Sequence, residues 1–217
     1  MALETEIKVR VESHDPVRTR LRSLGAKFLG RVLESNTIFD RPDGSLRRRG
    51  CGLRLRQTEP QPPRTEGEQG EAAPAPPPSP QKVMPTSPHG MRPGRAATLT
   101  LKGPLRPGAM KAREELELKV DDGATAMRVL DALGLVPVLA YEKRRESWAL
   151  DRCRVELDEP PHVGLFVEIE GPDEQTIRAV QRTLGLERRE HHQASYVHML
   201  MPYAADHADT NGVLRAP

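Results

Sequence analysis

Ionisable side chains alternate with apolar ones along the stretches of this chain that have the two-residue period of a β-strand. In residues 3–10, with the sequence LETEIKVR, acids and bases take every second position from Glu4 onward. Successive side chains of a strand point to opposite faces of a sheet. Each predicted strand therefore has one charged face and one apolar face, and this division constrains the fold more than any other feature of the sequence.

The alternation and the turn signals predict eight strands and four helices. The strands are expected at Leu3–Glu12, Ala26–Asp40, Gly52–Gln57, Ala97–Lys102, Ala112–Val120, Val138–Leu150, Arg152–Asp158 and Gly164–Glu170. The helices are expected at Asp15–Leu24, Ala124–Leu133, Glu174–Leu184 and, as a short element, near Ala194–Leu200. Asp15 followed by Pro16 is typical of a helix start.

An acidic strand followed by a helix recurs along the chain. Glu4–Val9 (ETEIKV) is repeated as Glu115–Val120 (ELELKV), and each copy precedes a helical pattern that ends in Leu-x-x-Leu-Gly. A shorter third copy begins at Glu168–Glu170 and leads to a helix that ends at Leu184 and Gly185. The recurrence indicates a duplicated strand–helix–strands unit.

The charged strand faces need a partner, and two hypotheses supply one. The simpler hypothesis is an antiparallel sheet with one wet face and cross-strand ion pairs. The recurring helices argue against it, because helices need the apolar strand faces to pack on. About eight antiparallel strands can close on themselves. We therefore predict an α+β fold, a closed eight-stranded antiparallel β-barrel with helices packed outside and the charges facing a tunnel.

Proline marks an interruption of this domain. Eleven of the 21 prolines lie between Pro60 and Pro93, in a stretch with almost no large apolar residue. Such a segment cannot bury enough surface to offset the entropy lost on ordering. Residues at about 60–95 are therefore expected to form a disordered insertion within a single domain that spans residues 1–202. Residues 203–217 are expected to form a flexible tail.

The overall charge and the apolar pattern exclude several classes of protein. The chain has 33 basic and 31 acidic side chains, and its formal net charge of +2 is too small for a protein that coats nucleic acid. No apolar run approaches the roughly 20 residues of a membrane span. The cysteines Cys51 and Cys153 make no disulfide framework. We expect a cytoplasmic protein with no nucleic-acid and no membrane partner, and the oligomeric state stays open, a homodimer included.

The two kinds of charge in one interior suggest a chemistry. Buried acids and bases are costly unless they are paired or joined by ions. Carboxylates bind hard divalent cations such as Mg²⁺, whereas Arg and Lys bind phosphate oxygens. The pattern therefore suits a complex of a metal ion with a polyphosphate.

The charged motifs resemble those of a known family. Glu4-x-Glu6-x-Lys8 is similar to the ExExK signature of the CYTH superfamily, the triphosphate tunnel metalloenzymes, which include class IV adenylate cyclases and thiamine triphosphatases. The resemblance continues in family order through Leu53–Arg56, Leu99–Lys102, Arg113–Glu117, Lys143–Arg145, Leu157-Asp158, Phe166–Glu170 and Ser195-Tyr196. It covers residues 3–200 apart from the insertion, and the stretches around Asn36 and Gly50–Arg56 look most like class IV adenylate cyclases. One departure is Ala194, where the family often has a lysine.

The resemblance implies a role for each charged residue. It implies that Mg²⁺ or Mn²⁺ would be held by Glu4, Glu6, Glu115, Glu117, Asp158, Glu168 and Glu170, of which Glu115 and Glu117 could instead orient the bases. It implies that the triphosphate would be held by Lys8, Arg54, Arg56, Lys102, Lys143 and Arg145. The residues implied to be catalytic are Glu4, Glu6, Asp158 and Glu168.

The resemblance implies a metal-dependent enzyme that acts on a small triphosphate, such as ATP, inorganic triphosphate or thiamine triphosphate. A class IV adenylate cyclase would convert ATP to cyclic AMP and pyrophosphate. The first alternative is an inorganic or thiamine triphosphatase, in which water attacks the terminal phosphate. The second is a non-catalytic module that binds polyphosphate or nucleotides, which the number of carboxylates disfavours because anion binding does not need them.

Overall fold

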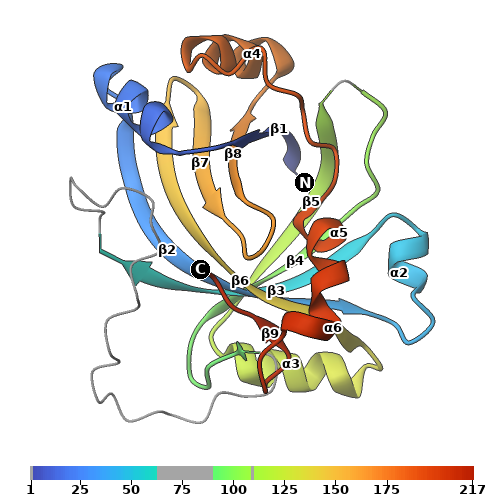
Figure 1. Cartoon of the computed structure of the whole chain (residues 1–217). Helices are drawn as coiled ribbons and strands as arrows, with labels where there is room; N and C mark the ends of the chain where they lie inside the picture. Colours follow the sequence, from blue (N-terminus) through green and yellow to red (C-terminus); the bar gives the residue numbers. More distant parts are fainter. Residues whose placement is uncertain (1, 63–89, 109) are drawn as a thin grey trace.

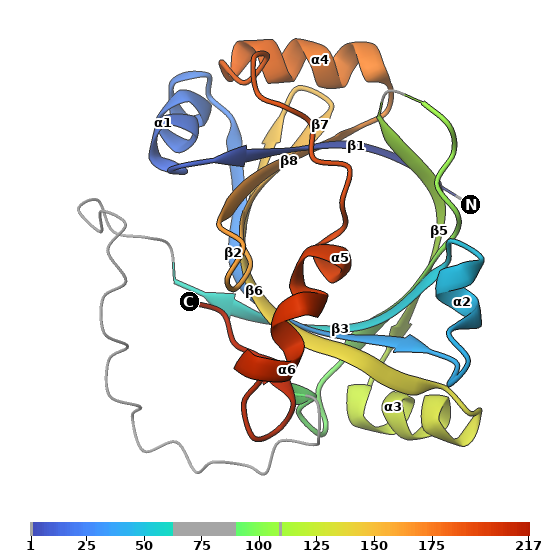
Figure 2. The same ribbon diagram turned by 45° about the vertical axis from the view of Figure 1, so that its right-hand side comes forward.

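A ring of eight antiparallel strands forms the body of the molecule, which is described by a computed structural model for residues 2–62, 90–108 and 110–217 (Figure 1). The strands are β1 (Ala2–Val11), β2 (Lys27–Asp40), β3 (Gly52–Gln61), β4 (Ala97–Lys102), β5 (Lys111–Val120), β6 (Val136–Leu150), β7 (Cys153–Glu159) and β8 (Leu165–Gly171). They pair in the order β2-β3-β4-β5-β1-β8-β7-β6, and β6 pairs again with β2. Figure 2 shows the ring from near its open end. The predicted closed barrel is confirmed.

Three longer helices lie outside the barrel and follow the acidic strands, as the internal repeat predicts. They are α1 (Asp15–Ser23), α3 (Gly123–Ala132) and α4 (Glu174–Thr183), which come after β1, β5 and β8. Each is followed by a Leu-Gly pair whose glycine is left-handed, with φ of 69° at Gly25, 77° at Gly134 and 72° at Gly185. Glycine adopts this conformation without steric cost, so the three copies of the motif end their helices in the same way.

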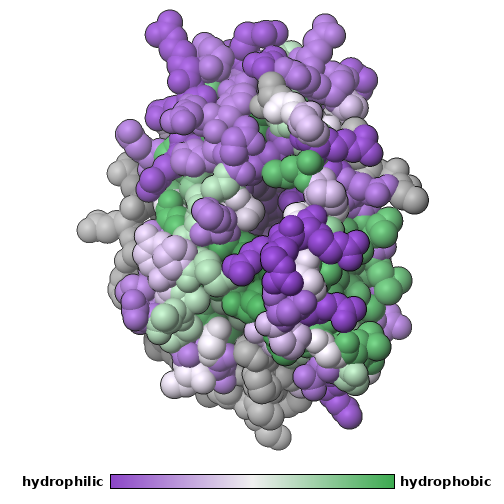
Figure 3. Space-filling view, turned by 90° about the vertical axis from the view of Figure 1, so that its right-hand side faces the viewer, coloured by the Kyte–Doolittle hydropathy of each residue, from purple (hydrophilic) through white to green (hydrophobic). Residues whose placement is uncertain are grey.

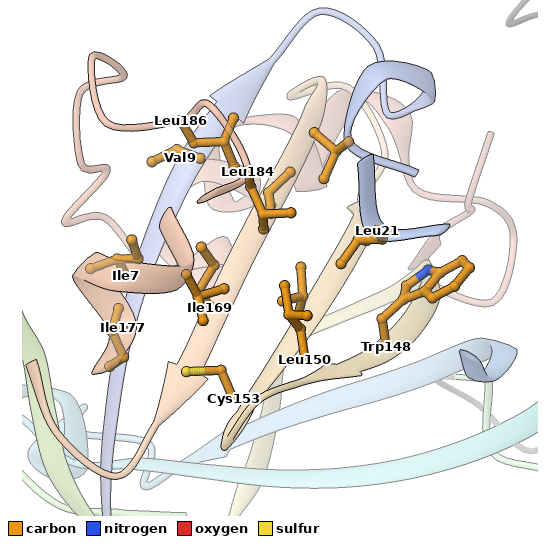
Figure 4. Close-up of a cluster of buried hydrophobic side chains, with 14 of the residues drawn as sticks. Ile7, Val9, Leu21, Trp148, Leu150, Cys153, Ile169, Ile177, Leu184 and Leu186 are labelled. Atoms are coloured by element: carbon orange, nitrogen blue, oxygen red, sulfur yellow. The ribbon is translucent and has the colours of Figure 1, made fainter. Parts of the chain in front are cut away.

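The largest apolar core lies between the barrel wall and the helices α1 and α4 (Figure 4). Val9 and Ile169 project outward from the paired strands β1 and β8, and both are fully buried. Leu21 of α1 and Ile177 of α4 are also fully buried in this cluster. Burial of one such side chain stabilises the fold by about 1.5–3 kcal/mol. Because the apolar strand faces pack outward against helices, the charged faces point into the barrel.

The ends of the predicted insertion are ordered, which corrects part of the expected range of 60–95. Strand β3 continues to Gln61, and Pro60 pairs with Val32 of β2. On the far side, Met91 is fully buried in the cluster under α3. The large apolar side chain of Met91 thus anchors this end of the stretch. Residues 63–89 of the predicted insertion lie outside the described residues.

The prediction of a flexible tail at residues 203–217 is wrong. After α5 (Tyr196–Leu200) and the 3₁₀ turn η2 (Met201–Tyr203), the chain forms α6 (Ala204–His207) and the short strand β9 (Val213–Leu214). Strand β9 pairs in parallel with Ala140 and Tyr141 of β6, and both of its residues are buried. The Asp209 carboxylate accepts backbone N–H groups of the turn. The buried side chains of Val213 and Leu214, together with the turn held by Asp209, attach this segment to β6.

A further element escaped the sequence analysis, the four-residue helix α2 (Ser45–Arg48) at one end of the barrel. Its start is held by the Asp40 carboxylate, which accepts hydrogen bonds from the backbone N–H groups of Leu46 and Arg47 at 2.9 and 3.2 Å.

No helix in the described part of the chain is long and apolar enough to cross a membrane. The outer faces of β4 and β5 keep Leu101, Leu116 and Leu118 exposed. Figure 3 shows hydrophobic surface on one side of the molecule, beneath a largely hydrophilic upper part.

Candidate active site

The barrel contains a cavity of about 1470 Å³ with a charged wall. Helix α5 lies across one opening of the ring, and Tyr196 and His198 contribute to the lining (Figure 2). The cavity brings together twelve of the thirteen site residues named from the sequence: Glu4, Glu6, Lys8, Arg54, Arg56, Lys102, Glu115, Glu117, Lys143, Arg145, Glu168 and Glu170. They come from six strands, β1, β3, β4, β5, β6 and β8, because each of these strands turns its charged face inward.

Asp158 is the one predicted site residue that does not line the cavity. It is fully buried behind the wall and accepts hydrogen bonds from Lys143 Nζ at 2.8 Å, Arg145 Nε at 2.7 Å and the Tyr196 hydroxyl at 2.8 Å. Burial by itself would raise the pKa of Asp158, but Arg145 and Lys143 hold this pKa well below its usual range. The carboxylate thus stays ionised and fixes two bases of the wall.

Glu34 of β2 is a second buried carboxylate of this network, and the sequence analysis missed it. Its Oε1 lies 2.6 Å from Arg56 Nη1, and its Oε2 lies 3.3 Å from Lys143 Nζ. Burial would raise the pKa of Glu34, but Arg56, Lys143 and Arg145 outweigh burial and lower the pKa. Together, Glu34 and Asp158 hold three bases at the β2–β6–β7 side of the cavity; we call these five residues the buried charge network.

The carboxylates at the β1–β5 side are arranged differently, because they face one another. Burial and a hydrogen bond with Glu115 raise the pKa of Glu4 to about 8. Glu115 carries the negative charge of the pair, and its contacts with Glu4, Lys102 and Arg113 outweigh burial and lower its pKa to about 2. Lys102 Nζ contacts Glu115 directly and lies 3.5 Å from Glu4 Oε2. Two close carboxylates thus share one proton, and a bound cation could take the place of that proton.

A second group of carboxylates surrounds Glu6. Burial and the negative charge of Glu168 raise the pKa of Glu6, and Glu170 lies opposite Glu6 in the β1–β8 register. Glu168 is held by bases on two sides, with Lys8 Nζ at 3.2 Å from its Oε1 and Arg145 Nη2 at 2.6 Å from its Oε2. Although burial opposes this effect, Lys8 is the main cause of a pKa of about 2 for Glu168. Acidic and basic groups therefore meet at Glu168.

The β3–β4 wall presents bases with spare hydrogen-bonding capacity. Arg54 Nη2 donates to Thr100 Oγ1 at 3.3 Å, and the Thr100 hydroxyl donates to Glu117 at 3.1 Å. Arg54 Nε is buried without a hydrogen-bond partner among the described residues. Burial and the adjacent Arg56 lower the pKa of Arg54 to about 10, so the guanidinium stays charged at neutral pH. A charged donor without a partner in a cavity wall is suited to an anionic ligand.

The donor set of the cavity fits a divalent cation that a substrate brings with it. In the described part of the chain, no group of three or more His, Cys, Asp or Glu side chains is already arranged to hold a metal ion. Mg²⁺ in enzymes is bound by one or two carboxylates together with substrate phosphates, so a closed protein cage is not required. The facing pairs Glu4–Glu115 and Glu6–Glu168 provide such carboxylates.

Other charged residues of the cavity wall were also missed. Lys111 shares the inner face of β5 with Arg113, but the strand was expected to begin one residue later, at Ala112. Glu156 alternates with Asp158 on β7, and both Glu156 and Arg154 of this strand line the cavity. Two-residue alternation was the signal that could have found these residues.

The fold and the wall define a class of protein, a closed antiparallel β-tunnel with an interior of paired acids and bases. Residues 2–196 match the family model described as the CYTH domain, and the chain belongs to this family. The resemblance drawn from the motifs is thereby confirmed. A relative from Methanocaldococcus jannaschii, named "Putative adenylate cyclase", is 25% identical over 168 residues, which are 77% of this chain and 76% of the relative.

Solved structures share the fold at lower identity. A protein from Pyrococcus horikoshii OT3 superposes with a TM-score of 0.67 and 20% identity, over 92% of this chain and 99% of that chain. A "putative adenylyl cyclase" from Hippeastrum, described as having a dominant triphosphatase activity, superposes with a TM-score of 0.59 and 16% identity, over 94% of this chain and 96% of that chain. These similarities show the same barrel.

Proposed function

We propose that this protein is a metal-dependent enzyme that acts on the triphosphate group of a small molecule inside the tunnel. The observation that carries the proposal is the wall around Arg54, a residue that lines a cavity large enough for a nucleotide and whose Nε is buried without a hydrogen-bond partner among the described residues. Unsatisfied buried donors are costly. A phosphate oxygen is the ligand that would satisfy a charged donor of this geometry.

The bases of the wall would bind and orient the phosphate chain. Lys8, Arg54, Arg56, Lys102, Lys143 and Arg145 are the residues that we assign to this task. The buried charge network keeps Lys143 and Arg145 in fixed positions through Asp158. We therefore propose Asp158 as a positioning residue and not as a metal ligand, because its oxygens already accept four hydrogen bonds.

Carboxylates on the other side of the cavity would hold Mg²⁺ or Mn²⁺. Those that line the cavity are Glu4, Glu6, Glu115, Glu117, Glu168 and Glu170. Bound with the substrate, the metal would neutralise negative charge on the phosphate oxygens, the main requirement of phosphoryl transfer. The closed barrel limits the access of bulk water to the bound phosphates and preserves the strength of these charge interactions.

Two reactions are compatible with this arrangement, and each has support among the relatives. Cyclisation of ATP to cyclic AMP and pyrophosphate is our first candidate, because the Methanocaldococcus relative is named for it. Hydrolysis of a triphosphate is the second, supported by the activity described for the Hippeastrum protein. The reactions differ in the nucleophile, a ribose hydroxyl in one and water in the other.

The decisive experiment separates these reactions from simple binding. The purified protein is incubated with Mg²⁺ or Mn²⁺ and with either ATP or inorganic triphosphate. Cyclic AMP and pyrophosphate identify a cyclase, whereas orthophosphate identifies a hydrolase. Tight binding without turnover would refute an enzyme and favour a binding module.

A matched pair of variants then tests the cavity itself. Arg54→Met removes the guanidinium whose Nε lacks a partner among the described residues, and it should lower the affinity for inorganic triphosphate at least tenfold, since a hydrogen bond to a charged group contributes about 1.5–3 kcal/mol. Arg128→Met is the control, because Arg128 is exposed on α3, away from the cavity lining. Equal affinities of the two variants, measured by calorimetry, would contradict the assignment of the site.

A further inference from the structure

Lys111, the first residue of β5, is a buried lysine of the cavity wall outside the motif set. It lies opposite Glu6 in the β1–β5 register, which turns both side chains to the interior. Its Nζ lies 3.6 Å from Glu6 Oε1 and donates to the backbone carbonyl of Ala194 at 3.3 Å. Ala194 precedes α5, so Lys111 lies where this helix meets the barrel opening.

Lys8 approaches the same carbonyl from the neighbouring strand. Its Nζ donates to the Ala194 oxygen at 3.2 Å, lies 3.2 Å from Glu168 Oε1 and lies 3.8 Å from the centre of the Tyr196 ring. Two ammonium groups thus converge on one uncharged oxygen. They repel each other, and the carbonyl supplies only a partial negative charge between them.

The contacts of Lys111 are looser than those of a lysine that is fully engaged by protein. Lys143 lies 2.8 Å from the Asp158 carboxylate and is almost completely buried. Charge-assisted hydrogen bonds between nitrogen and oxygen usually measure about 2.7–2.9 Å, and the contacts of Lys111 with Glu6 and with Ala194 are both longer. An ammonium group carries three donors, so Lys111 has capacity for a further acceptor.

We infer that Lys111 is a substrate-binding residue that, together with Lys8, contacts a phosphate oxygen at the α5 end of the cavity. A phosphate oxygen between the two ammonium groups would relieve their mutual repulsion, which the Ala194 carbonyl cannot do. The inference rests on the proposed function, because it assumes that the tunnel takes a triphosphate. It adds one base to the six that the motifs name.

The competing explanation is purely structural, with Lys111 fastening α5 to the barrel through the Ala194 carbonyl. The two explanations differ in what they require of the side chain. A fastening residue needs only a hydrogen-bond donor, whereas a phosphate-binding residue needs the positive charge. Lys111→Gln keeps a donor and removes the charge, Lys111→Arg keeps both, and Lys111→Met removes both.

The test measures two quantities for each variant and for the wild-type protein. Calorimetry with inorganic tripolyphosphate and Mg²⁺ gives the affinity, and thermal unfolding without ligand gives the stability. Lys119→Met is the control, because Lys119 lies on the same strand, is exposed and does not line the cavity. We expect Lys111→Gln and Lys111→Met to bind at least tenfold more weakly, Lys111→Arg to bind within about threefold of wild type, and the control to be unchanged.

The outcomes separate the inference from the function on which it rests. If wild-type protein binds tripolyphosphate and Lys111→Gln binds equally well, the inference is overturned while the proposed function stands. If Lys111→Gln and Lys111→Met have lower melting temperatures but the wild-type affinity for tripolyphosphate, Lys111 only fastens α5 to the barrel. If the wild-type protein itself fails to bind tripolyphosphate, the proposed function fails and the inference fails with it.

Discussion

Replacement of Glu34 by glutamine should destabilise the protein strongly, although no motif marks this residue. Its carboxylate is 2% exposed and lies 2.6 Å from Arg56, 3.3 Å from Lys143 and 3.8 Å from Arg145. Removal of one partner from a buried ion pair typically costs about 3–5 kcal/mol, because the remaining charge stays desolvated. Glutamine keeps one acceptor oxygen, so we expect a loss near the lower limit, about 3 kcal/mol.

The measurement is thermal and urea unfolding at pH 7 without ligand. For a chain of this length, 1 kcal/mol corresponds to about 2–4 °C, so the melting temperature should fall by about 6–12 °C. Glu174→Gln is the control, since its pair with Arg178 on α4 is exposed, and such pairs contribute about 0.3–0.5 kcal/mol. If both variants lose the same small amount, the bases of the buried charge network do not depend on Glu34.

The pH dependence of the same variant gives an independent test. The pKa of Glu34 is lower in the folded protein than its ordinary value of 4.5. A lowered folded pKa stabilises the protein above the unfolded pKa, and this contribution disappears as the pH falls through the folded pKa. The difference in stability between wild type and Glu34→Gln should therefore be constant above about pH 5 and shrink below it. A difference that grows on acidification would refute the reasoning.

Three further predictions concern packing, thiol chemistry and metal. Gly171→Ala would place a Cβ 2.7 Å from Cys153 Sγ and 2.9 Å from Ile177 Cγ1, so urea unfolding should show a loss of about 1–3 kcal/mol; Gly52→Ala, with open space, should show almost none. Burial raises the pKa of Cys153 to about 11, and native protein at pH 8 should therefore take up a single iodoacetamide, at Cys51; two additions by intact mass would contradict this. Removal of divalent cations with EDTA should abolish turnover of ATP or inorganic triphosphate, and added Mg²⁺ or Mn²⁺ should restore it; full activity in EDTA would exclude a metal role for the carboxylates.

The period of two predicted the barrel because it identified which face of each strand had to be covered. Ile7 and Val9 could not stay in water, and the helix that follows β1 supplied a surface for them. Elements that depend on side-chain hydrogen bonds had no such signal. Helix α2 starts because the Asp40 carboxylate accepts backbone N–H groups six and seven residues later. The periodicity of apolar residues in the sequence gives no sign of a hydrogen bond of this kind.

The missing members of the site have physical explanations too. Glu34 lies on β2, where the pairing register with β6 shifts between Phe28 and Gly30 and again between Ile38 and Phe39. Each shift interrupts the alternation that identifies an inward face. Asp158 was predicted from the sequence. However, the alternation cannot distinguish a carboxylate that lines the cavity from one that is buried behind the cavity wall in hydrogen bonds with Lys143 and Arg145. That distinction depends on distances across strands.

The two kinds of carboxylate in the barrel have pKa values that are shifted in opposite directions. This difference separates the carboxylates that hold the bases in place from those that could bind a metal ion. Glu34 and Asp158 are surrounded by bases and have lowered pKa values, so they stay ionised and paired with those bases. Glu4 and Glu6 are buried beside other carboxylates and have raised pKa values, so they tend to keep their protons. A divalent cation would favour the ionised form of these carboxylates and take the place of the protons, whereas the same cation near Asp158 would have to displace Lys143 and Arg145. The geometry therefore favours metal binding at the β1 side and phosphate binding by the bases that the buried charge network fixes.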